Sequence, residues 1–258
     1  EAITLDDTSL AVATLNTLNG NTTGVVNAAT INTLTGAAAA MNTAYTANTD
    51  GEISGLGNEA ITLDDTSLAV ATLNTLNGNT TGVVNAATIN TLTGAATAMN
   101  TAYVANANGT ISNLGNEAIT LDDTSLEVAT LNTLNGNTTG VVNAATINTL
   151  TGGAVAINTA YTAGGNGEIS NLGNEAITLD DTSLAVVTLN TLNGNTTGVV
   201  NAGTVATLTG AAAAMNTAYT AGGNGEISNL GNEAITLDDT SLAVATLNTL
   251  NGNTTGVV

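Results

Sequence analysis

The feature that most constrains this chain is an internal repeat. The run EAITLDDTSL occurs five times at a spacing of 59 − 1 = 58 residues, beginning at Glu1, Glu59, Glu117, Glu175 and Glu233. A fixed period of this kind is typical of arrays in which each unit buries its apolar surface against its neighbours. The sequence therefore predicts one continuous solenoid that is a fragment of a longer array. Its expected repeats are 1–58, 59–116, 117–174, 175–232 and a partial repeat, 233–258.

The composition limits the chemistry. The chain has no Lys, Arg, His or Cys, and its 20 acidic residues give a net charge of −20. Without basic residues we expect no binding to nucleic acid, because phosphate recognition rests on Lys and Arg. Without Cys there are no disulfides and no thiolate metal sites. Only dissolved ions can screen the carboxylates, which favours a saline or calcium-containing setting. No apolar run approaches the roughly 18 residues of a membrane span, so we expect no membrane insertion.

The first half of a repeat has the pattern of a strand followed by a helix. Residues 2–5 alternate apolar and β-branched polar side chains, which indicates a short strand. The run 6–9, Asp-Asp-Thr-Ser, is typical of a helix start, with Thr8 as the predicted N-cap. The spacing of Leu10, Val12, Leu15 and Leu18 predicts one apolar helix face, and Gly20 is the predicted stop. In the third repeat Glu127 replaces an alanine and predicts a capping box with Thr124.

The second half repeats this order. Residues 25–28 predict a second strand, 30–34 a tight turn, and 36–45 a second helix capped by Thr35. Strand and helix alternating in one direction produce parallel strands joined by right-handed crossovers. The predicted fold is therefore an α/β solenoid with a parallel sheet on one side and short helices on the other, with two β-α steps per repeat. An all-β solenoid is the alternative.

Metal binding is the sharper of the chemical hypotheses. The turn after the second predicted helix, with Asp50 and Glu52, resembles the oxygen-rich start of a calcium loop. An Asp-Asp pair recurs in every repeat and could recruit cations as a stacked row, although helix capping explains the same residues. Calcium is the candidate cofactor. The candidate ligands are Asp6, Asp7, Asp64, Asp65, Asp122, Asp123, Asp180, Asp181, Asp238, Asp239, Asp50 and Glu52.

Other recurring residues favour structural roles. One tyrosine per repeat lies on the apolar face of the second predicted helix, where packing explains it better than a carbohydrate site. The run Asn21-Thr22-Thr23 matches an N-glycosylation acceptor and equally a turn. Catalysis is not expected, because the His, Cys, Lys and Arg on which most catalytic sites depend are missing.

The run LGNEAITLDDTSLAVATLNTLNGNTTGVVNAATINTLTG, followed by NTAY, resembles the tandem repeats of very large cell-surface or secreted proteins of marine cyanobacteria. This resemblance covers the whole chain and implies an extracellular, non-enzymatic array at the cell surface. We therefore expect a structural repeat module of a giant surface protein or filament, whose partners are neighbouring repeats or copies of itself. The alternatives are a calcium-dependent adhesin that binds cell-surface glycans, and a self-assembling fibre subunit.

Overall fold

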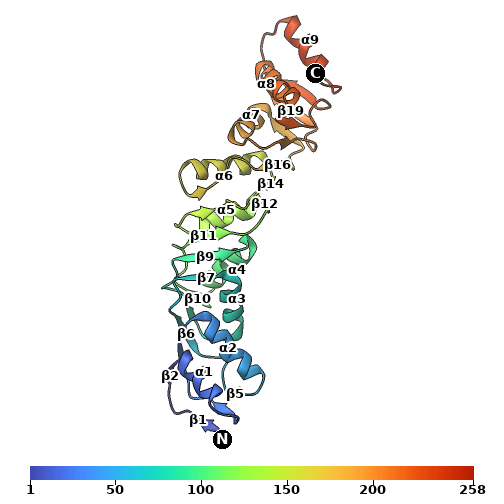
Figure 1. Ribbon diagram of the computed structural model, residues 1–258. Coiled ribbons are helices and arrows are strands. Elements are labelled where there is room, and N and C mark those ends of the chain that lie inside the picture. The colour runs from blue at the N-terminus through green and yellow to red at the C-terminus, as the bar shows by residue number, and fades with distance from the viewer. The chain divides into compact units, whose positions relative to one another are not determined.

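The computed structural model describes residues 1–258 (Figure 1). The chain forms two compact units. The first contains Glu1–Asp122 and Gly136–Val142, and the second contains Asp123–Asn135 and Asn143–Val258. Within each unit short parallel strands alternate with helices, so the predicted α/β repeat solenoid is confirmed and the all-β alternative is wrong.

Each complete repeat carries two helices, and the partial fifth repeat carries one. The helices are α1 (Val12–Gly20), α2 (Ala38–Thr49), α3 (Val70–Asn79), α4 (Ala96–Ala107), α5 (Val128–Asn137), α6 (Ala154–Gly165), α7 (Val186–Asn195), α8 (Ala212–Gly223) and α9 (Val244–Asn253).

Each complete repeat carries five strands. Those of the first two repeats are β1 (Ile3–Thr4), β2 (Ser9–Ala11), β3 (Val26–Asn27), β4 (Thr33–Gly36), β5 (Ile53–Ser54), β6 (Ala60–Leu63), β7 (Ser67–Ala69), β8 (Val84–Asn85), β9 (Thr91–Gly94) and β10 (Ile111–Ser112). The later ones are β11 (Ala118–Leu121), β12 (Ser125–Glu127), β13 (Val142–Asn143), β14 (Thr149–Gly152), β15 (Ile169–Ser170), β16 (Ala176–Leu179), β17 (Ser183–Ala185), β18 (Val200–Asn201), β19 (Thr207–Gly210), β20 (Ile227–Ser228) and β21 (Ala234–Leu237).

The sheets cross the repeat boundaries. In the first unit one sheet has the order β10-β8-β6-β4-β2, with two strands from the first repeat and three from the second. In the second unit the sheet β12-β14-β16-β18-β20 combines the third and fourth repeats in the same way. The paired residues of the first sheet form an apolar column of Leu10, Leu34, Ile61, Val84 and Ile111. A repeat therefore completes its sheet only with strands from the next one.

Both helices of a repeat begin later than predicted. α1 starts at Val12 with Ala11 as its N-cap and no side-chain cap, so the prediction of Thr8 as cap is wrong. α2 starts at Ala38 after the N-cap Ala37, so Thr35 does not cap it. The residues before both helices are extended, because β2 and β4 pair with each other in parallel. The backbone amides and carbonyls of these residues are paired between the two strands, so they do not need the hydrogen bonds of a longer helix. Leu34 of β4 is completely buried.

The predicted capping box at Glu127 is also wrong. Glu127 is the last residue of β12, where it pairs with Thr151 of β14, and its side chain is exposed. Likewise, Gly20 is the last residue of α1, and α3 continues one residue beyond the equivalent glycine to Asn79.

The predicted apolar faces do form the core. Val12, Leu15, Met41 and Ala44 are at most 1% exposed. Consecutive helices of each unit pack side by side, and asparagines join them. In the first unit Asn16 of α1 donates from Nδ2 to the carbonyl oxygen of Ala40 in α2 at 2.9 Å. The high asparagine content thus has a structural cause, since an amide reaches a neighbouring helix backbone without carrying a charge.

Candidate functional site

Every boundary between repeats contains a fully buried carboxyl group. These glutamates have 0% exposure, although the chain holds no basic residue that could neutralise them; they are Glu59, Glu117, Glu175 and Glu233. An acidic side chain is rarely buried without a partner, because leaving water costs several kcal/mol. The surroundings of the four glutamates therefore decide how the array can bury them.

The donors around Glu59 are all neutral. The Tyr45 hydroxyl donates to Oε2 at 2.8 Å, and the Gly57 amide donates to Oε1 at 3.0 Å and to Oε2 at 2.9 Å. In the later repeats the tyrosine hydroxyl lies 3.0, 2.9 and 3.1 Å from the equivalent carboxyl oxygen. We call this arrangement of glutamate, tyrosine and glycine the glutamate cradle.

Elements of two repeats build each cradle. Tyr45 belongs to α2 of the first repeat, whereas Glu59 immediately precedes β6 of the second. Thr80, just after α3, donates from Oγ1 to the backbone oxygen of Glu59 at 2.7 Å and accepts the Gly82 amide at 3.0 Å. A Cβ atom on Gly82 would overlap the Glu59 backbone, so only glycine fits there. The cradle thus links the second helix of one repeat to the first strand and helix end of the next.

The electrostatics of the cradle appear in its tyrosines. Burial raises the pKa of Tyr45 well above its usual range, and the nearby Glu59 carboxylate raises it further. The pKa values of Tyr103 and Tyr161 are also raised, mainly by burial. Tyr219 is less buried, and burial together with Glu233 raises its pKa to about 12. The hydroxyl therefore stays protonated and keeps donating at any ordinary pH.

Three of the Asp-Asp pairs cap helices, but not the helices that follow them. Asp65 accepts the amide of Ala38, the first residue of α2, through Oδ2 at 2.7 Å. Asp181 and Asp239 cap α6 and α8 at the same distance. The second aspartate of each of these pairs thus caps the second helix of the preceding repeat. The first aspartate of each pair is exposed; these residues are Asp6, Asp64, Asp122, Asp180 and Asp238.

The structure brings no three of the candidate acidic ligands together into a group that could hold a metal ion. Asp50 and Glu52 do line a common cavity of about 460 Å³ with Asn19, Thr22 and main-chain atoms of the adjacent glycines. Asn19 donates from Nδ2 to Glu52 Oε2 at 3.1 Å. Calcium binding at these residues therefore stays a prediction.

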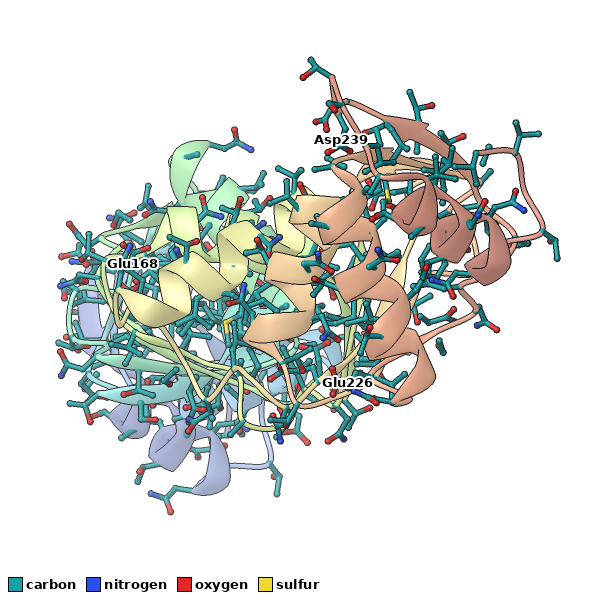
Figure 2. The ribbon with its side chains drawn as sticks, turned by 90° about the horizontal axis from the view of Figure 1, so that it is seen from above. Glu168, Glu226 and Asp239 are labelled. Carbon is teal, nitrogen blue, oxygen red and sulfur yellow. The ribbon has the colours of Figure 1, made fainter.

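The acidic turn recurs in the second unit. Asn135 and Asn193 donate to Glu168 and Glu226 at 3.1 and 3.2 Å. Glu226 and the capping residue Asp239 lie at opposite ends of α8 (Figure 2). One acidic residue therefore lies at each end of this helix.

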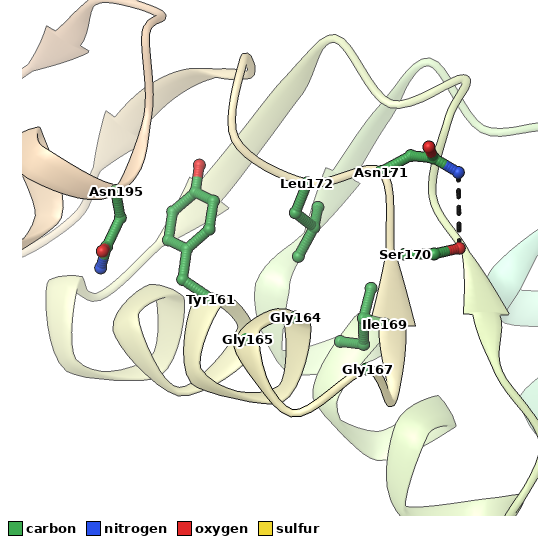
Figure 3. Close-up of a pocket in the computed structure, with 9 residues that line it drawn as sticks. All are labelled: Tyr161, Gly164, Gly165, Gly167, Ile169, Ser170, Asn171, Leu172 and Asn195. Carbon is green, nitrogen blue, oxygen red and sulfur yellow. Dashed lines mark hydrogen bonds between the residues drawn. The ribbon is translucent and has the colours of Figure 1, made fainter.

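A second cavity lies beside a cradle. It has a volume of about 400 Å³ and is lined by Tyr161, Leu172, Asn195 and the turn after α6 (Figure 3). Asn171 has a positive φ of 65° and donates from Nδ2 to Ser170 Oγ at 3.4 Å. No charged side chain lines this cavity, so it presents a neutral surface of amide, hydroxyl and apolar groups.

Sequence reasoning missed the buried glutamates. A single acidic residue between Asn and Ala is typical of a surface turn. The available signal was its fixed position in every repeat, two residues after Gly57 and once for each tyrosine. The packing role predicted for the tyrosines is confirmed, since Tyr45, Tyr103 and Tyr161 are at most 9% exposed. The first threonine of the Asn-Thr-Thr run is half-buried at Thr22 and buried in the four later copies, Thr80, Thr138, Thr196 and Thr254, and glycosylation there stays a prediction.

No protein-family model, curated protein or solved structure matches this chain. None of the nine helices is both long and apolar enough to cross a bilayer.

Proposed function

We propose that the chain is a structural repeat module of an extracellular array, with no catalytic role of its own. The observation that carries this proposal is that adjacent repeats share both a sheet and a glutamate cradle. The buried glutamate and tyrosine that recur at each boundary join two repeats and are closed off from solvent. Such a chain resists separation of its repeats, which is what a stalk or a surface layer requires.

The high acidic charge supports an extracellular setting. The net charge of −20 has no internal counter-ions, so dissolved cations must screen it. Sea water or another salt-rich medium supplies these cations, and its high ionic strength shortens the distance over which the carboxylates repel one another. The proposed cell-surface location also follows the resemblance carried by the repeat sequence.

Single-molecule force spectroscopy on the full chain tests the mechanical role. Because neighbouring repeats share sheets, we expect a stepwise force curve with releases of one or more repeats. One repeat of 58 residues, the spacing from Glu1 to Glu59, releases about 200 Å at roughly 3.6 Å per residue. A chain that extends without force peaks would contradict the proposed mechanical role.

A calcium-dependent adhesive array is the second candidate. It is favoured by the cavity that holds Asp50 and Glu52, whose carboxylate, amide and hydroxyl oxygens are of the type calcium prefers. If this function is correct, Ca²⁺ raises the melting temperature of the chain, a chelator reverses the effect, and Glu52→Gln reduces it. Glu1→Gln is the control, because Glu1 lies outside that cavity. Identical melting in Ca²⁺ and in chelator at constant ionic strength would exclude this candidate.

A further inference from the structure

In each of the four complete repeats an equivalent turn follows the second helix. Three of these four turns contain an exposed Asn-Gly pair. The pairs are Asn108-Gly109, Asn166-Gly167 and Asn224-Gly225. At the same place the first repeat has Asp50-Gly51. The repeats therefore differ at this position by the replacement of a side-chain amide with a carboxylate.

We infer that these three asparagines are sites of spontaneous deamidation, which converts their turns toward the chemistry of the first repeat. The backbone nitrogen of the glycine attacks the side-chain carbonyl carbon of the asparagine. A carbon–nitrogen bond forms, the bond to the amide nitrogen breaks, and ammonia leaves with the proton from the glycine nitrogen. Water then opens the cyclic imide at either carbonyl, giving aspartate or isoaspartate. The net change is one water consumed and one ammonia released.

The geometry of the turn favours the attack. Asn166 is the C-cap of α6, it is exposed, and no hydrogen bond holds its side chain. Gly167 has a φ of +82°, and nothing lies within 4 Å of the position a Cβ atom would take. Ring closure needs rotation of the Asn166 backbone, which breaks the bond from the Gly167 amide to the Gly164 oxygen at 3.1 Å. An exposed helix end opens in this way at low cost.

The same dipeptide occurs inside helices, where the structure protects it. Asn135-Gly136 lies in α5, and Nδ2 of Asn135 donates to Glu168 Oε2 at 3.1 Å. Its neighbours Leu134 and Thr138 are 0% and 8% exposed, so rotation there disturbs buried residues. Asn193-Gly194 in α7 has the equivalent surroundings. Two chemically identical dipeptides therefore experience different constraints in one chain.

The product is compatible with the fold. Asp50 has φ −78° and ψ −7°, close to the −80° and −10° of Asn166, and both are C-cap residues. Conversion of all three turns adds three negative charges to the existing 20 acidic residues. In the third and fourth repeats the converted turn has the two carboxylates that Asp50 and Glu52 give the first.

The experiment compares both kinds of Asn-Gly pair within one peptide. The folded full chain is kept in mildly alkaline buffer for days, then denatured and cleaved after glutamate, since trypsin has no site. The fragment 128–168 contains both Asn135 and Asn166. Tandem mass spectrometry locates the gain of about 1 Da that marks deamidation. We expect conversion at Asn166 to be at least about tenfold faster than at Asn135, because helix opening is the slower route.

The unfolded chain is the control. In concentrated urea the two asparagines should convert at similar rates, since only the fold distinguishes them. The variant Asn166→Asp provides the reference peptide for the aspartate product. Equal deamidation rates at Asn135 and Asn166 in the folded chain would overturn the inference. It would also be overturned if Asn166 deamidated in urea but not in the folded chain.

Discussion

Removing one tyrosine hydroxyl tests whether the glutamate cradle stabilises the array. In Tyr161→Phe the ring remains, so no cavity forms, but Glu175 Oε2 loses a donor at 2.9 Å. The Gly173 amide, at 2.9 Å from Oε2 and 3.3 Å from Oε1, is then the remaining donor to a carboxyl group with 0% exposure. A hydrogen bond to a charged group contributes about 1.5–3 kcal/mol, and we expect the free energy of unfolding to fall by that amount.

The fourth cradle provides a graded comparison. Tyr219 is only partly buried, and its hydroxyl lies 3.1 Å from Glu233. Water can replace part of the lost bond there, so Tyr219→Phe should cost less than Tyr161→Phe. The assay is urea unfolding followed by circular dichroism, because the chain has no tryptophan. Each kcal/mol corresponds to a fall of about 2–4 °C in the melting temperature of a chain of this size.

A double-mutant cycle separates the cradle from general packing. Glu175→Gln alone and together with Tyr161→Phe gives the coupling energy between the two side chains, which we expect to be about 1–2 kcal/mol. Two observations would refute the reasoning: an unfolding midpoint unchanged by Tyr161→Phe, or a coupling energy of zero. Either would mean that the buried carboxyl group draws no stability from the hydroxyl.

Three further predictions concern pH, glycine and helix capping. The tyrosine pKa values are raised in the folded chain, to about 12 for Tyr219, so the tyrosines contribute fully to stability below their usual pKa of about 10. This contribution is lost as the pH rises above that value. The urea midpoint of unfolding should therefore fall between about pH 9 and about pH 12, and a constant midpoint would contradict the prediction. Gly140→Ala places a Cβ atom against the backbone of Glu117 and should destabilise the chain by several kcal/mol. Gly136→Ala has open space around it in α5 and should be neutral or stabilise by up to about 1 kcal/mol. Equal urea midpoints for the two variants would be inconsistent with the close contact between Gly140 and the Glu117 backbone. Asp181→Ala removes the cap of α6 and should lower the free energy of unfolding by about 0.5–2 kcal/mol, whereas Asp180→Ala should change it very little. Thermal unfolding measures both variants. A larger loss for Asp180→Ala would show that Asp181 is not the residue that caps α6.

The architecture was predictable because the repeat is a strong and redundant signal. The same apolar spacing occurs in every copy, and the faces that contain Leu15 and Met41 are indeed buried. The alternation of short strands and helices left few topologies, since crossovers between parallel strands have one hand. Both the class of fold and the two helices per repeat follow from local pattern alone.

The helix boundaries were not predictable from local pattern. Residues 6–9 have the composition of a helix start, yet Ser9–Ala11 is a strand, because it pairs with residues 24 positions later, as Ser9 with Thr33. The caps are equally non-local. Asp65 caps a helix that begins 27 residues before it, at Ala38. Propensity describes a segment on its own, whereas these contacts exist only after the chain has completed a turn.

The candidate site shows the same division. Asp50 and Glu52 were predicted as calcium ligands because their turn is rich in oxygen ligands; the structure places them in one cavity, and calcium binding there stays a prediction. Glu59 was missed because its environment is formed by a tyrosine 14 residues earlier and a threonine 21 residues later. Nothing adjacent to it in sequence indicates burial.

The sheets that cross repeat boundaries have a consequence for how such an array changes length. A sheet that takes two strands from one repeat and three from the next has no natural first residue, so any position in the period is as good a joining point as any other. Recombination between two copies at matching positions then adds or removes whole repeats while every strand keeps its former neighbours. Recombination can thus lengthen or shorten the array without creating a single new contact. Only a junction between positions that do not match within the 58-residue period would disrupt the pairing of the strands.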